Sequence, residues 1–295
     1  PLPQLMGGSV DAPPPVSNLS CPKCGAALET DQVVCLSCGH NLDDPIEEAD
    51  ATAVLPQEKR KIPPSLSYEN EMAGFVIHSY YHPTSAVADI LNRVYPNLTV
   101  VGSVTMSPEI GGLNPSAVQV AADMGGKVVW LPGNIETHLI DNMGKLPSNV
   151  HDILDIILDH DMVLALGGLS YTKTLTFFEE AKNKGIKRMI VSDSETKMSA
   201  QELEEIVSLG ALIELGFASY MSSTMENTPA KMLETVKAFG ADKCIITSNF
   251  GQWFNPTPAE GMRMAIASLI QTGISQNEVS KMVKTNPLEL VSLDS

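Results

Sequence analysis

Four cysteines near the start of the sequence have the spacing of a metal site. They form two Cys-x-x-Cys-Gly knuckles separated by ten residues, at Cys21, Cys24, Cys35 and Cys38. Each knuckle places two thiolates on one side of a tight turn, and two knuckles complete the tetrahedron that Zn²⁺ prefers. The spacing therefore predicts one structural zinc ion per chain. Iron in a rubredoxin-like pair of knuckles is the alternative.

The composition around the cysteines divides the chain into four parts. Residues 1–19 are rich in Pro, Gly and Ser, which predicts a disordered tail. Residues 20–42 are the zinc ribbon, whose small size means that metal binding must supply its folding energy. An acidic linker follows at 43–50, and residues 51–295 have the composition of one α/β domain.

Charge and hydropathy restrict the partners and the location. The formal net charge of −16 opposes binding to nucleic acid phosphates and anionic lipids. No apolar run reaches the roughly 18 residues that span a membrane, and the first residues do not resemble a signal peptide. We therefore expect a cytoplasmic protein that binds neither nucleic acid nor membrane.

Short apolar runs alternate with helical patterns from residue 51 onward. The runs are continuous rather than alternating with polar residues, as in strands buried on both faces of a parallel sheet. The predicted strands are Phe75–Ile77, Leu98–Val104, Lys127–Leu131, Met162–Leu166, Arg188–Val191, Ala211–Leu215 and Cys244–Thr247, with an eighth at Ala51–Leu55. Helices are predicted at about 84–95, 114–124, 148–160, 171–184, 199–209, 228–239, 257–272 and 275–284.

Helix punctuation supports this alternation. Asn114 before Pro115 predicts a helix start, and Ser199 with Glu202 has the spacing of a capping box. Glycines follow the helices, as at C′ positions, and a strand follows each of the last three glycines. Eight such units predict a (β/α)8 TIM-like barrel, with an irregular or missing first strand as a variant. An open doubly wound sheet is the alternative, but it lacks a dinucleotide glycine fingerprint.

The sequence also resembles the amidohydrolase-like metal-dependent hydrolases, which are (β/α)8 barrels. The resemblance covers about three quarters of the chain. It rests on the stretches HSYYHPT (78–84), GGLNPSAV (111–118), KVVWLP (127–132), SNFGQ (248–252), NPTPAEGMR (255–263) and GISQNEVSKMVKTNPLELVSL (273–293). The resemblance implies a site at the C-terminal ends of the strands, where a metal would activate water for hydrolysis of C–N or ester bonds.

The resemblance also marks departures from the family pattern at the metal ligands. Thr52 and Val54 stand where the first strand carries His-x-His, and Gly168 stands where a histidine is expected. Asp193 replaces another histidine, and Asn249 replaces the final aspartate. These replacements predict a barrel that keeps the fold without the hydrolytic metal centre.

Weak candidates for a remodelled site remain after the strands. They are His78, His82, Asp193 and Asn249, with Glu214 after a further strand. Imidazoles and carboxylates at this end of a barrel are the groups that bind a metal or transfer protons. Hydrogen bonding within loops is the alternative role for the two histidines.

Four functions follow from these patterns. The first expectation is a non-catalytic scaffold, docking or regulatory subunit of a larger assembly, with a protein partner or a second copy of the chain. The alternative is a metal-dependent hydrolase of a small molecule. A protein that binds a small molecule in the barrel mouth is third, and nucleic-acid binding through the ribbon is fourth because of the acidic charge.

The cysteine pattern makes a stoichiometric prediction. Elemental analysis of protein purified without added metal should find one zinc per chain, because four thiolates fill one tetrahedral site. Two or more metals per chain would show that a second, hydrolytic centre survives in the barrel.

Overall fold

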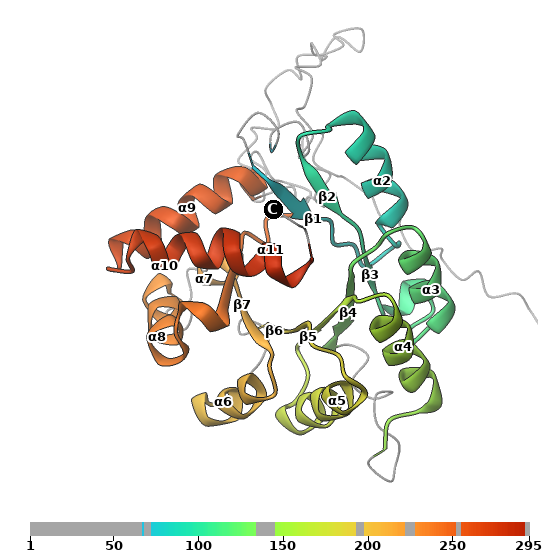
Figure 1. Cartoon of the computed structure of the whole chain (residues 1–295). Coiled ribbons are helices and arrows are strands. Elements are labelled where there is room, and N and C mark those ends of the chain that lie inside the picture. The colour runs from blue at the N-terminus through green and yellow to red at the C-terminus, as the bar shows by residue number, and fades with distance from the viewer. Residues whose placement is uncertain are drawn as a thin grey trace, which may run out of the picture. The chain divides into compact units, whose positions relative to one another are not determined.

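The computed structural model divides the chain into two compact units, Pro1–Arg60 and Lys61–Ser295. It describes residue 67 and residues 72–133, 145–192, 198–221, 228–251 and 255–292, all in the second unit. The tail, the zinc ribbon, the acidic linker and the strand at Ala51–Leu55 lie outside these residues and stay predictions. In the second unit, parallel strands lie inside a ring of helices (Figure 1).

All ladders between the described strands are parallel, and each strand pairs with the next along the chain. The strands are β1 (Gly74–Val76), β2 (Thr99–Val101), β3 (Ser103–Thr105), β4 (Val128–Pro132), β5 (Val163–Gly167), β6 (Met189–Ser192), β7 (Leu212–Gly216) and β8 (Cys244–Thr247). β2 and β3 are halves of one predicted strand, so the seven predicted strands within the described range are confirmed. No ladder joins β8 to β1 among the described strands.

Helices follow the strands as predicted. They are α2 (Ser85–Val94), α3 (Pro115–Asp123), α4 (Ser148–Asp159), α5 (Tyr171–Lys184), α6 (Ala200–Ser208), α7 (Phe217–Tyr220), α8 (Pro229–Phe239), α9 (Pro258–Gln271), α10 (Gln276–Ser280) and α11 (Asn286–Leu290), with short 3₁₀ turns at Pro108–Ile110 and Ala241–Lys243. The Asn114 side chain accepts hydrogen bonds from Ser116 N and Ala117 N at 3.1 and 3.3 Å. Ser199 and Glu202 form the predicted capping box. Local sequence therefore fixes where these helices begin.

The end of the chain differs from the prediction of one helix over 275–284. A π-helical turn at Lys281–Thr285 follows α10, and α11 continues the chain to Leu290. The buried Asn286 amide donates to the backbone oxygens of Ala241 and Cys244 at 2.8 and 2.7 Å. These bonds attach α11 to the start of β8, which local helix propensity alone does not specify.

A polar wedge separates β1 from β3. The hydroxyl of Thr84, a fully buried residue, donates to Ile77 O at 2.8 Å and accepts from Ser103 N at 2.8 Å. The wedge depends on Gly102, because a Cβ there would lie 2.5 Å from the Cα of Ser85. The predicted strand is thus interrupted at Gly102, where α2 packs against its backbone.

Two apolar layers hold the unit together. Alternate residues of each strand face the helices and form the larger cluster, such as Leu164 and Leu166 of β5. The intervening residues Val163 and Ala165 face the inside, with inward residues of the other strands. A strand buried on both faces has this alternation without polar positions, which explains the continuous apolar runs.

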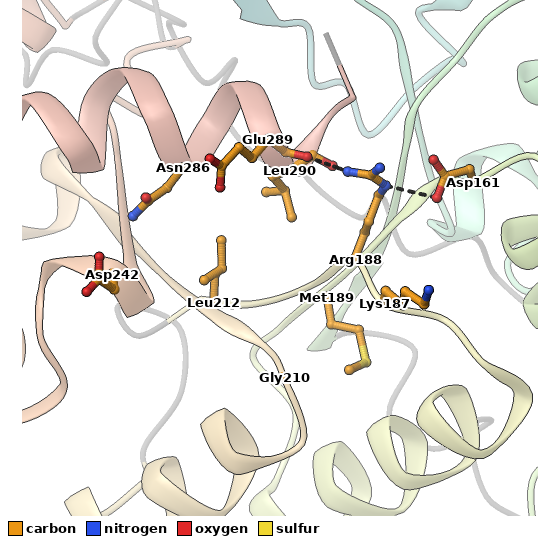
Figure 2. Close-up of a pocket in the computed structure, with 10 residues that line it drawn as sticks. All are labelled: Asp161, Lys187, Arg188, Met189, Gly210, Leu212, Asp242, Asn286, Glu289 and Leu290. Carbon is orange, nitrogen blue, oxygen red and sulfur yellow. Dashed lines mark hydrogen bonds and ion pairs between the residues drawn. The ribbon is translucent and has the colours of Figure 1, made fainter. Parts of the chain in front are cut away.

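The C-terminal helix α11 closes the N-terminal end of the strands. Leu290 and Val291 belong to the inner cluster together with Val101, Val128 and Ile190. Figure 2 shows Arg188, directly before β6, reaching the end of α11. Its guanidinium donates to Leu290 O at 2.9 Å and to Glu289 O, and it pairs with Asp161 at 2.9 Å. Arg188 therefore caps the C-terminal carbonyls of α11.

A cavity of about 330 Å³ lies beside this contact (Figure 2). Part of its charged lining is engaged, because Arg188 caps α11 and pairs with Asp161, and Asp242 pairs with Lys281. Lys187 and Glu289 also line the cavity. The cavity lies at the N-terminal ends of the strands, whereas barrel active sites form at the C-terminal ends. It is therefore a gap between α11 and the N-terminal ends of the strands.

Among the described residues, no helix has the length and apolar character that a membrane span needs.

The Arg188 contact predicts a stability effect. Arg188→Met should lower the free energy of unfolding by about 2 kcal/mol, because the last carbonyls of α11 lose charged hydrogen-bond donors. It should also speed amide hydrogen exchange in α11. Asp161→Asn should change stability little, since that carboxylate side chain is 63% exposed. Chemical denaturation measures each variant.

Arg93→Met is the matched control, because Arg93 and Asp89 form an ion pair with side chains 78% and 52% exposed. Equal effects of Arg93→Met and Arg188→Met would contradict the capping role of Arg188.

Candidate active site

The C-terminal ends of the strands carry the polar side chains of the interior. Trp130 and Leu212 pack on the inner apolar cluster, so their strands present alternate residues inward. Two positions after Leu212, Glu214 shares that face, and Ser192 is its partner across the β6–β7 ladder. Thr105 is in turn the partner of Trp130 across β3–β4. The inner face thus changes from apolar at one end of the strands to polar at the other, which we call the mouth.

One wall of the mouth is aromatic. The His78 ring, two residues after β1, lies 4.8 Å from the Tyr80 ring and 5.0 Å from the Trp130 ring, centroid to centroid. His78 is an exposed residue by its total surface, and the rings of Tyr80 and Trp130 pack against its imidazole. Burial lowers the pKa of His78 below its usual 6.5, because a charged imidazolium loses hydration there. His78 is therefore neutral at pH 7.

The opposite part of the ladder carries a carboxylate. The Thr247 hydroxyl donates to Glu214 Oε1 at 2.9 Å, and Glu214 is half-buried on the inner face of β7. Ser192, its ladder partner, is 6% exposed. Removing a carboxylate from water costs free energy. The hydrogen bond from Thr247 offsets part of this cost and orients the Glu214 side chain.

Two donors in the mouth have no partner among the described residues. They are the Thr105 hydroxyl and the Trp130 indole N–H, both inaccessible to water. Thr105 is 1% exposed. An unpaired buried donor costs about 1–3 kcal/mol, so its presence requires an explanation.

His82 lies in an exposed turn apart from these groups. Its ring Nδ1 is 3.2 Å from the Ser79 hydroxyl, which also accepts from Tyr81 N at 3.2 Å. This contact matches the alternative of a loop hydrogen bond. A role for His82 in chemistry stays a prediction.

Asn249 follows β8 and is exposed, with a φ of 53°. Asparagine is one of the few residues besides glycine that adopts this left-handed conformation readily. Asp193 lies outside the described residues, so its place in the site stays a prediction. The structure therefore describes four of the five candidates and brings His78 and Glu214 to the mouth.

The described residues do not form a metal site. No group of three or more His, Cys, Asp or Glu side chains comes together in the described part of the chain. His78 and Glu214 supply potential ligands; His78 contacts the rings of Tyr80 and Trp130, and Glu214 accepts a hydrogen bond from the Thr247 hydroxyl. No catalytic step is therefore derived through a metal.

Sequence reasoning missed Thr105, Trp130, Ser192 and Thr247. The sequence carried a signal for these four residues, because each is polar or amphipathic and lies near the C-terminal end of an otherwise apolar run. The register that makes neighbours of Thr105 and Trp130 comes only from the ladder.

Comparison with solved structures shows what the fold resembles. A phosphotriesterase homology protein from Escherichia coli, complexed with phosphate in its active site, has a TM-score of 0.56 at 12% identity, covering 77% of this chain and 88% of that one. A probable 2-pyrone-4,6-dicarboxylic acid hydrolase from Acinetobacter baumannii, with citric acid bound, has a TM-score of 0.53 at 12% identity over 77% and 87%. An organophosphorus hydrolase from Deinococcus radiodurans has a TM-score of 0.52 at 11% identity over 78% and 81%.

These neighbours confirm the α/β fold with a parallel sheet and the amidohydrolase-like resemblance at the level of fold. They contradict the prediction of a non-catalytic scaffold, because the similar structures are hydrolases and favour the hydrolase alternative. That prediction relied on ligands missing at expected positions. It gave less weight to the candidates His78 and Glu214, which the structure places at the mouth as an imidazole and a carboxylate.

Sequence comparison gives the family. None of the curated proteins compared with the chain matches it. Residues 66–214 match the model of a family of unknown function, DUF6282, and this match spans 149 of the 295 residues. The chain belongs to the DUF6282 family.

Proposed function

We propose that this protein is a hydrolase of a small molecule, acting at the mouth of its barrel. The observation that carries the proposal is the Glu214 carboxylate, held on the inner face by Thr247 at 2.9 Å. The fold likeness to three hydrolases supports the proposal. The bond cleaved is an ester or a C–N bond.

Glu214 is the general base in this proposal. Its carboxylate takes a proton from water as the water oxygen bonds to the acyl carbon. The protonated Glu214 then gives that proton to the leaving oxygen or nitrogen as its bond to the acyl carbon breaks. The Thr247 hydroxyl orients the carboxylate by donating to one of its oxygens. Neutral His78 on the aromatic wall supplies a hydrogen-bonding nitrogen and a flat surface for the substrate.

The zinc ribbon is a second part of the proposal. We place one structural zinc at Cys21, Cys24, Cys35 and Cys38, on the spacing of the two knuckles. A cytoplasmic location, self-association or a protein partner, and a contribution of Asp193 or Asn249 to the site are further proposals. The metal count per chain separates a filled ribbon from a second metal in the mouth.

The role of Glu214 predicts a loss of rate without a loss of fold. Glu214→Gln should lower hydrolysis by about a hundredfold to ten-thousandfold, since the amide keeps the hydrogen bond from Thr247 but accepts no proton. Proton release from a panel of lactones and esters, and amine release from a panel of amides, measures the rate. Thermal melting should stay at the wild-type value or above.

Glu260→Gln is the matched control, because Glu260 is an exposed glutamate of α9 paired with Arg263. Full activity in Glu214→Gln would remove Glu214 from the mechanism, and inactivity of the wild-type chain toward the whole panel would contradict the proposed function.

The environment of His78 predicts a pH dependence. Its folded-state pKa is lowered, so the unfolded chain binds the proton first as the pH falls. The contribution of neutral His78 to stability is complete above about pH 6.5 and is lost as the pH falls through the folded-state pKa. His78→Gln should therefore reduce the fall in melting temperature between pH 7 and pH 5.

NMR of the imidazole C–H signals measures the titration directly, with the His78 signal assigned by its loss in His78→Gln. Titration at or above pH 6.5 would show that Tyr80 and Trp130 do not desolvate the ring.

A further inference from the structure

Helix α2, in the outer ring of helices, has an exposed apolar face (Figure 1). Val87, Ile90 and Val94 are 40%, 60% and 59% exposed, and their spacing of three and four residues places them on one face of the helix. Another side of α2 is buried in the unit through Ser85 and Ala88. No other described helix carries as many exposed large apolar side chains. We call Val87, Ile90 and Val94 the α2 stripe.

The charges of α2 cancel. Its charged residues are Asp89 and Arg93, which form an ion pair at 3.0 Å. The chain as a whole has a formal net charge of −16. The α2 stripe is therefore an apolar surface on a helix without net charge, in a strongly acidic protein.

Other helices of the ring expose carboxylates instead. α4 exposes Asp152, Asp155 and Asp159, and α6 exposes Glu204 and Glu205. A basic partner would be attracted to these helices, because opposite charges steer association. The α2 stripe gives a basic partner no such attraction, so it fits a partner surface that is itself apolar and without net charge.

A second copy of the chain has such a surface. Two acidic copies repel each other least where the surfaces in contact carry no net charge. A two-fold axis at Ile90 would pair two α2 helices antiparallel, with Val87 of one copy against Val94 of the other. A spacing of three and four residues is also that of helices that pack side by side.

We propose that the α2 stripe is the contact between two copies of this chain in a two-fold symmetric dimer. α2 has ten residues, whereas a standard interface has about 20–30 residues a side. The dimer is therefore weak and reversible, with a dissociation constant on the order of 10–100 μM. This inference names the surface of the proposed self-association, and it does not depend on hydrolysis.

The experiment measures mass against concentration by sedimentation velocity, with the full chain and a reducing agent that prevents disulfides between copies. The samples are the wild type, Ile90→Lys, Ile90→Glu and an equimolar mixture of these two variants. Ile270→Lys and Ile270→Glu are the matched controls, because Ile270 is an isoleucine of α9 that is 41% exposed. Val94→Lys is a second variant of the stripe.

The average mass of the wild type should rise toward that of a dimer with concentration. Ile90→Lys, Ile90→Glu and Val94→Lys should each weaken association by at least about a hundredfold, because each buries uncompensated charges at the contact. The mixture of the two Ile90 variants should associate, since the lysine of one copy lies beside the glutamate of the other. The Ile270 controls should associate like the wild type.

Salt distinguishes this contact from an electrostatic one. Raising the NaCl concentration from about 0.05 M to about 0.5 M should strengthen association, because salt screens the repulsion between two acidic copies and leaves apolar contacts in place. Thermal melting at low concentration checks the fold of each variant. Each should melt like the wild type, because the changed side chains are exposed.

Three results would overturn the inference: a wild-type chain that stays monomeric at every concentration, association of Ile90→Lys and Val94→Lys equal to that of the wild type, or a mixture of the Ile90 variants that stays monomeric. Hydrolysis is scored separately. A stripe-dependent dimer without hydrolysis would refute the proposed function alone, and hydrolysis by a chain that never dimerises would refute the inference alone.

Discussion

The inward-facing side chains of the parallel strands are the constraint on which the rest of the structure depends. Helices cover the outer face, so the inner face must be filled by the strands themselves or by another part of the chain. Near the N-terminal ends, valines and isoleucines fill it together with Leu290 and Val291 from the C-terminal segment. This filling leaves the C-terminal ends as the place where polar inner residues gather.

The two ends of the strands therefore differ in whether their polar groups have hydrogen-bond partners. At the N-terminal end, Arg188 satisfies the last carbonyls of α11 and keeps the apolar plug in place. At the mouth, Thr105 and Trp130 have donors without partners among the described residues, and the half-buried Glu214 accepts a hydrogen bond from Thr247. Such features cost free energy, and proteins concentrate them at functional sites.

The prediction of a non-catalytic scaffold was wrong for an identifiable reason. It rested on five positions at which a metal-binding family places ligands, including Gly168 and Asn249. The inner face of a barrel, however, is built from every strand, and proton transfer needs a carboxylate and an ordered water rather than one fixed set of positions. In the proposed function, Glu214 on β7, the strand before Asn249, is that carboxylate. Function depends on the site and not on the correspondence of individual ligands.

The sequence by itself determined the order of strands and helices, because apolar runs, Asn114 and Ser199 caps, and C-terminal glycines are local signals. It also determined the cysteine spacing that predicts a zinc ion, and it placed His78 after a strand. Tertiary structure alone decided the pairing of Thr105 with Trp130 across the β3–β4 ladder. It also decided the interruption of the strand at Gly102 and the packing of α11 against the N-terminal ends of the strands. Each depends on contacts between segments far apart in the chain, such as Arg188 with Leu290, and local propensity carries no information about such contacts.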